Sequence, residues 1–117
     1  MLTKYYMDFS FTDTLYEGDQ DGYKSFLKVS QEEFATDFET MKDALRNNNA
    51  QGFSDIKHKF TTRLSTFRLE SLEAFLQSIS NAFKSESVTL DTELTLEELE
   101  IHIKGIMKML EEKNNAL

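Results

Sequence analysis

The sequence predicts an all-α protein, an antiparallel up-down-up-down four-helix bundle with a short N-terminal helix. Apolar residues recur every three or four positions through four long segments, as expected for amphipathic helices. The chain has no proline, which removes the commonest helix breaker, and no cysteine, which leaves the fold without disulfides. Its 117 residues suit a single domain, 1–117, in which we expect the bundle over residues 19–113.

Residues 1–18 carry more apolar area than a solvated tail needs. We expect an extended lead-in, then a short helix over residues 12–17 that ends at Gly18 and covers one end of the bundle. Asp19 or Asp21 can cap the first long helix. That helix is expected to end in the polar run 46–49, and so tight a turn makes the next helix its antiparallel neighbour.

The second long helix contains His58, and we expect it to break from the third at residues 66–68. The apolar pattern of the third long helix ends at residues 84–87, and residues 85–94 are predicted to form a loop. Thr95 and Glu98 have the spacing of a capping box, which predicts that the last helix begins there. From Asn114 onward the chain is expected to fray.

The formal net charge is −8 and the sequence pI is about 4.7. A nucleic-acid partner would be repelled, and no basic patch with interleaved aromatic residues offsets that repulsion. No apolar run has the length of a secretory leader or of a membrane span, which predicts a cytoplasmic protein without membrane contact. We also expect a monomer.

His58 lies on the side of its helix that the apolar residues leave exposed. At about 100° per residue, the apolar positions from Phe53 to Phe67 form one stripe roughly 80° wide, and His58 points about 160° away from its centre. It shares its strip with small polar residues, so its imidazole is accessible to the active site of a partner protein. The members of this strip that we predict to bind a partner are Ser54, Asp55, Thr61, Thr62 and Ser65.

His102, the other histidine, lies beside the apolar stripe of the last helix, which predicts a partly buried packing role. The two histidines have no metal-ligand spacing, so we expect no metal site and no cofactor of the chain's own. The sequence also has no Gly-rich phosphate loop and no context for a nucleophilic triad. An enzyme with its own active site is therefore not expected.

Three runs of the sequence, taken with the predicted topology, resemble the histidine-containing phosphotransfer (HPt) domain of multistep phosphorelays. Residues 15–21 (LYEGDQD) are similar to the family's entry into its second helix. Residues 41–45 (MKDAL), the Asn turn and Ala50 are similar to the run that precedes the family histidine, whose place His58 takes. The apolar positions after it are Phe60, Leu64, Phe67, Leu69 and Leu72, and the similarity spans about residues 15–110.

The resemblance implies that His58 accepts a phosphoryl group from an aspartate of a response-regulator receiver domain and passes it to another receiver. In that family the receiver supplies the aspartate and Mg²⁺, so the domain is a carrier and not an enzyme. The partners implied are receiver domains and a hybrid sensor histidine kinase. Asp55, one turn before His58, is a candidate to orient the other ring nitrogen.

Three positions depart from the family pattern, which usually has Lys, a small residue and Gly three, four and ten residues after the histidine. Here these are Thr61, Thr62 and Arg68. The charge of a phosphoryl group would then be neutralised by Lys59, by Arg63 or by the partner. Two alternatives remain open: a pseudo-HPt adaptor that binds receivers without being phosphorylated, and an unrelated helical protein-interaction module.

Overall fold

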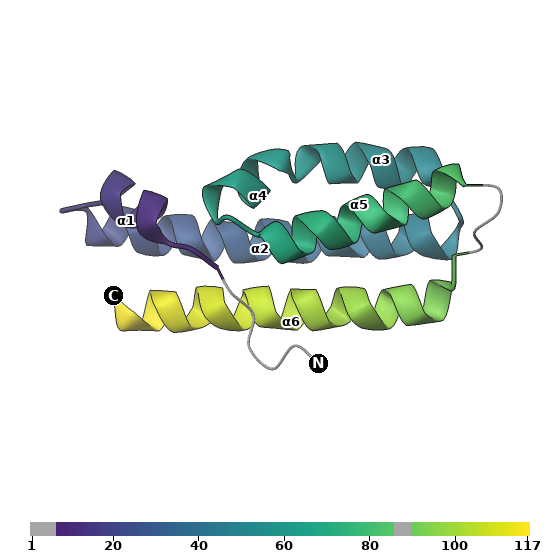
Figure 1. Ribbon diagram of the computed structural model, residues 1–117. Coiled ribbons are helices and arrows are strands. Elements are labelled where there is room, and N and C mark those ends of the chain that lie inside the picture. Colours follow the sequence, from purple (N-terminus) through teal and green to yellow (C-terminus); the bar gives the residue numbers. More distant parts are fainter. Residues whose placement is uncertain (1–6, 86–89) are drawn as a thin grey trace.

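The computed structural model describes residues 7–85 and 90–117, and within them the regular structure is helical (Figure 1). Its helices, in chain order, are α1 (Ser10–Leu15), α2 (Gln20–Arg46), α3 (Ala50–Lys59), α4 (Thr61–Thr66), α5 (Glu70–Lys84) and α6 (Thr92–Ala116).

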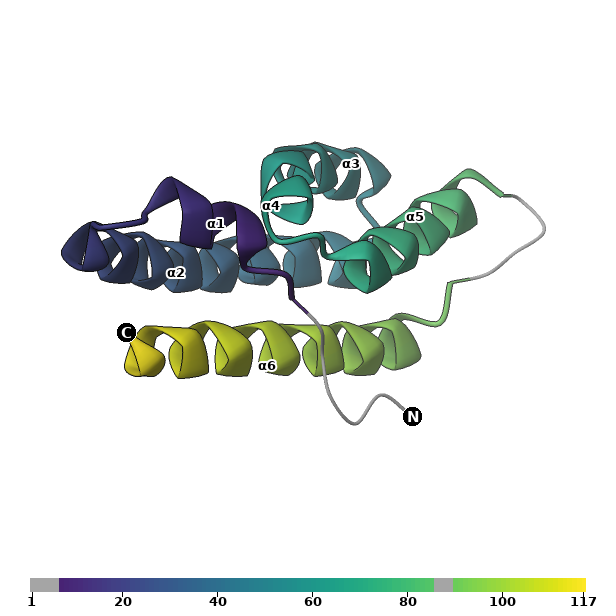
Figure 2. The ribbon, with the colours of Figure 1, turned by 60° about the vertical axis from the view of Figure 1, so that its left-hand side comes forward.

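The long helices α2 and α6 lie side by side along an elongated molecule of 52 × 28 × 19 Å (Figures 1 and 2). Helices α3, α4 and α5 cover one half of α2, and α1 lies over its N-terminal half. The chain runs up α2, down α3 and α4, up α5 and down α6. The predicted fold class, a four-helix bundle with a short N-terminal helix, is confirmed. None of the helices in the described residues is long and apolar enough to cross a membrane.

A side-chain cap begins each of the two helices α2 and α3, which are joined by a tight turn. Asp19 is the cap of α2, since its Oδ1 accepts from the Gly22 amide at 3.0 Å. At the far end, Asn48 adopts a left-handed φ of 51°, and the Asn49 side chain accepts from the Gly52 amide at 2.9 Å. The polar run therefore ends one helix and caps the next, as expected of asparagine.

The short helix α1 begins two residues earlier than predicted. The Asp8 carboxylate accepts from the Ser10 amide at 2.8 Å and so satisfies a donor at its start. The chain then turns at Gly18, whose φ of 81° is the left-handed conformation that glycine adopts readily. The helix itself ends at Leu15, two residues before the predicted end, and Gly18 lies in the turn that leads into α2.

The predicted start of α6 is wrong by one turn. Asp91, and not Thr95, is the cap: its carboxylate accepts from the Leu94 amide at 3.2 Å, while Thr95 lies inside the helix and donates its hydroxyl to the Asp91 carbonyl at 2.7 Å. The predicted loop 85–94 is therefore shorter, and its residues 86–89 lie outside the described part. Fraying from Asn114 is also wrong, because the Asn114 amide donates to the Lys24 carbonyl of α2 at 3.1 Å and α6 continues to Ala116.

The second predicted helix is divided at Phe60 into α3 and α4. The Phe60 amide donates to the carbonyls of both Ile56 and Lys57, each at 3.1 Å, which tightens the turn. The Phe60 side chain is fully buried, and its ring lies 5.6 Å from Phe34 and 5.3 Å from Phe38 between ring centroids. His58 is consequently the penultimate residue of α3 and not a mid-helix residue.

The predicted break at residues 66–68 is confirmed, with Arg68 at a φ of 50°. Phe67, just before it, is buried against Phe9 and Phe26, at centroid distances of 5.8 and 6.0 Å. Aromatic rings thus fill the core on both sides of α4. The fully buried large side chains are Leu27, Phe34, Phe38, Met41, Leu45, Phe53, Phe60, Phe67, Leu69, Leu72, Leu76 and Leu99.

Replacing the ring at the division of the second helix tests how much the core depends on it. We expect Phe60→Ala to lower the free energy of unfolding by about 3–5 kcal/mol, because it leaves a cavity between α2 and the α3–α4 junction. Urea denaturation measures this. The matched control is Phe11→Ala, since Phe11 is 60% exposed and its loss should cost less than about 0.5 kcal/mol. Equal effects of the two substitutions would contradict this account of the core.

Candidate functional site

His58 is exposed at the edge of a groove between the α3–α4 segment and α5. The groove has a volume of about 280 Å³. Its lining is mostly polar, which suits a surface that meets water or a polar partner rather than an apolar ligand. The residues that line it are Ser54, Lys57, His58, Thr61, Leu64, Ser65, Glu73 and Gln77.

The structure divides the predicted partner-binding strip. All five of its residues are exposed, but only Ser54, Thr61 and Ser65 line the groove of His58. Thr62 lines a separate hollow of about 250 Å³ on the other side of α4, together with Lys59 and Arg63. Asp55 lines neither hollow. Their roles in partner binding stay predictions.

The Asp55 carboxylate is held within its own helix. Its Oδ1 accepts from the Gln51 side-chain amide at 2.8 Å. Among the described residues, no side chain forms a hydrogen bond or an ion pair with the His58 imidazole. His58 is thus exposed without a side-chain partner in this part of the chain, and Asp55 does not contact its ring through a hydrogen bond in this structure.

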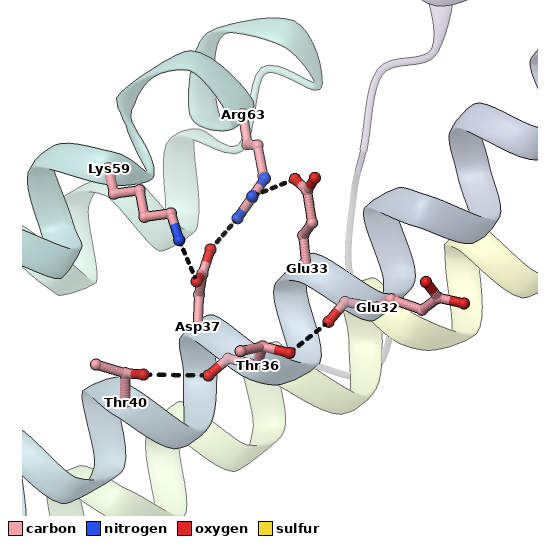
Figure 3. Close-up of polar contacts among 7 residues, drawn as sticks. All are labelled: Glu32, Glu33, Thr36, Asp37, Thr40, Lys59 and Arg63. Carbon is pink, nitrogen blue, oxygen red and sulfur yellow. Dashed lines mark hydrogen bonds and ion pairs between the residues drawn. The ribbon is translucent and has the colours of Figure 1, made fainter.

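Asp37 of α2 is a buried carboxylate, only 2% exposed, that binds the α3–α4 junction. Lys59 donates to its Oδ1 at 3.0 Å, and Arg63 donates to its Oδ2. Arg63 also donates to Glu33, one turn earlier on α2. Figure 3 shows both cations pointing down from the junction onto α2. This pairing offsets the cost of burying a charged group.

The Arg63 guanidinium also stacks over the aromatic core. Its central carbon lies 5.3 Å from the centre of the Phe34 ring and 5.6 Å from that of Phe60. Cation–π contacts of this kind add to the ion pairs in fixing the side chain. Lys59 and Arg63, the two candidates for neutralising a phosphoryl group, are thus directed toward Asp37 and away from the groove of His58.

Two residues that matter here were missed by reasoning from the sequence. Asp37 falls three residues after Phe34 and four before Met41, within the buried stripe of α2, and a charged residue in such a stripe was the available signal. Lys57 reaches across the groove and donates to the Gln77 side-chain oxygen of α5 at 2.8 Å. Nothing in the sequence indicated that contact, because it joins two different helices.

His102 of α6 is half-buried and stacks on Phe75 of α5, with ring centroids 4.9 Å apart and planes inclined by 21°. Burial lowers the pKa of His102, and the negative charge of Glu98 partly opposes that shift. The packing role predicted for this histidine fits its position. Within residues 7–85 and 90–117, no group of three or more His, Asp or Glu side chains is arranged to hold a metal ion.

Comparisons with known proteins add no relative to this picture. No family model matches the chain, and neither do any curated protein or solved structure at a significant level. The resemblance to HPt domains therefore rests on three short runs of sequence and on the order of the helices.

The buried carboxylate gives a first test of the site's support. Asp37→Asn should lower the free energy of unfolding by about 1.5–3 kcal/mol, because the charge-assisted bonds from Lys59 and Arg63 are lost. Asp43→Asn is the matched control on the same helix: Asp43 is exposed and lies 3.7 Å from Arg46, so less than about 0.5 kcal/mol is expected. Chemical denaturation of both variants measures these free energies of unfolding. A loss for Asp37→Asn no larger than the control's would show that these ion pairs do not hold the junction.

The lowered pKa of His102 predicts a pH dependence of stability. Below the ordinary value of 6.5 the unfolded chain binds the proton that the folded chain resists, so the free energy of unfolding should fall as the pH drops through that value. Urea denaturation between about pH 5.5 and 7.5 measures the slope. His102→Gln should flatten it, because the group with the lowered pKa is then absent. A slope that is the same in His102→Gln as in the unsubstituted chain would contradict this role of His102.

Proposed function

We propose that this chain is a phosphorelay signalling protein in which His58 accepts a phosphoryl group from a receiver-domain aspartate and passes it to another receiver. The observation that carries the proposal is an exposed imidazole, without a side-chain partner in the described residues, at the edge of a polar groove on a helical bundle. A carrier of this kind needs an accessible ring nitrogen on a rigid support and little else.

The reaction uses the imidazole as nucleophile. A ring nitrogen of His58 donates its lone pair to the phosphorus of an aspartyl phosphate, the bond from phosphorus to the carboxylate oxygen breaks, and the carboxylate leaves with that electron pair. The other ring nitrogen loses its proton to water, which leaves a neutral imidazole ring that bears the anionic phosphoryl group. The partner supplies the aspartate and the Mg²⁺ that lowers the charge of the phosphoryl oxygens, so the chain itself is a carrier and needs no cofactor.

The receiver would dock over the groove, with the small hydroxyl residues Ser54, Thr61 and Ser65 at the centre of the contact. These side chains are exposed and short, so they leave room for a partner's active site to approach the ring of His58. Such signalling encounters bury modest areas and are transient. A hybrid sensor histidine kinase would be the source of the phosphate, and the cytoplasm the site of the exchange.

A second candidate is an adaptor that binds receivers without carrying phosphate. Two observations favour it: the side chains of Lys59 and Arg63 are engaged by Asp37 of α2, and Thr61 stands where the family has its lysine. A third, an unrelated helical interaction module, would bind no receiver in a Mg²⁺-dependent manner. Transfer of phosphate separates the first candidate from the other two.

The proposal predicts a label on one histidine. When the purified chain is mixed with a panel of radiolabelled phospho-receivers and Mg²⁺, it should gain a phosphate that is labile in acid and stable in base, as a phosphoramidate is. His58→Gln should abolish the label, and His102→Gln should retain it. Label on His58→Gln, or loss of label in His102→Gln alone, would reject the site. Receiver binding without any label would favour the adaptor.

A further inference from the structure

A phosphoryl group on His58 would add about −1.5 to −2 charges to a chain that already carries −8. The groove beside it already holds one carboxylate, that of Glu73. A nearby cation would therefore help the domain to hold the group. The cations at the junction, Lys59 and Arg63, are bound to the carboxylates of α2.

Lys57 is the cation that lines the groove together with His58. The two residues are adjacent in the chain and so lie about 100° apart around α3. Ser54 and Thr61 line the same groove, so that Lys57 and His58 lie beside small hydroxyl residues. Both side chains therefore border the same hollow beside α5.

Among residues 7–85 and 90–117, no carboxylate pairs with the charge of Lys57. In the described part of the chain Lys57 takes part in no ion pair, and its ammonium donates to the neutral side-chain oxygen of Gln77 at 2.8 Å. The Gln77 amide nitrogen donates in turn to Asn81 at 3.0 Å, and this bond keeps the Gln77 oxygen turned toward Lys57. A lysine ammonium has three donors, so two remain for other acceptors.

We infer that Lys57 is the residue of this chain that pairs with the phosphoryl oxygens of phospho-His58, an inference that rests on the proposed function. Lys57 replaces, from the residue before the histidine, the cation that Thr61 does not provide. Gln77 holds its ammonium over the groove until the group arrives. Lys57 is a positioning and charge-neutralising residue and does not take part in bond making.

The test loads His58 without any receiver. Phosphoramidate phosphorylates histidine directly: the ring nitrogen attacks phosphorus, the phosphorus–nitrogen bond of the reagent breaks, ammonia leaves, and the imidazole loses a proton. Phosphorus NMR then follows the ionisation of the phosphoryl group with pH in the whole chain. His58→Gln identifies the signal that belongs to His58, since His102 remains in that variant.

An adjacent cation lowers the pKa of an anionic group. Lys57→Met should therefore raise the second pKa of the phosphoryl group on His58 by about one unit relative to the unsubstituted chain. Lys59→Met is the matched control, because it removes the same charge from the opposite flank of His58, where Asp37 binds it, and should leave the phosphoryl pKa unchanged. Urea denaturation verifies that both variants remain folded.

Three results would overturn the inference: no phosphorylation of His58 by phosphoramidate, the same phosphoryl pKa in Lys57→Met as in the unsubstituted chain, or an equal shift in Lys59→Met. Because no receiver is present, the result is independent of the receiver-transfer experiment. Failure of receivers to label the chain would reject the proposed function, while a shift specific to Lys57→Met would still establish the charge contact.

Discussion

The pairing of a buried carboxylate with two cations is the constraint on which the arrangement of this bundle depends. Asp37 lies in the apolar stripe of α2, where an uncompensated charge would be costly. Lys59 and Arg63 reach it from the two sides of the division between α3 and α4. Phe60, between them in sequence, fills the core at the same point. One short segment thus supplies both the ionic and the apolar contacts that hold α3 and α4 on α2.

That attachment determines what the opposite side of α3 presents. Lys59 and Arg63 are drawn toward α2 (Figure 3). The groove on the side facing α5 is lined by Lys57, His58 and a row of hydroxyl groups, among other residues. The two cations of the junction, Lys59 and Arg63, are thus bound to α2, whereas Lys57 lies on the groove side. Among the described residues, Lys57 is bound by the neutral amide of Gln77 and forms no ion pair, so it can change partners without breaking one. This division of charge connects the stability of the junction with the chemistry proposed for its other face.

The number, order and direction of the main helices were predictable, because apolar periodicity and local caps such as Asp19 are written in consecutive residues. The division at Phe60 was not predictable, because neither glycine nor proline marks it. The division depends on how the Phe60 ring packs against Phe34 and Phe38 of α2. The start of α6 was missed because both Asp91 and Thr95 are good cap residues, and only the structure distinguishes them. In the candidate site, the exposure of His58 followed from the wheel. The contacts of Asp37 and Lys57 could not be predicted, because each contact joins two different helices.

The measurement that tests the central claim most directly starts with the phosphoryl group already on His58. The chain is phosphorylated with phosphoramidate, freed of reagent, and mixed with Mg²⁺ and receiver domains that are shown to accept phosphate from a small-molecule donor. The account predicts that at least one receiver gains the phosphate as His58 loses it, and that chelation of Mg²⁺ stops the transfer. If no receiver of this kind changes the rate at which phospho-His58 decays, the chain is not a phosphorelay carrier.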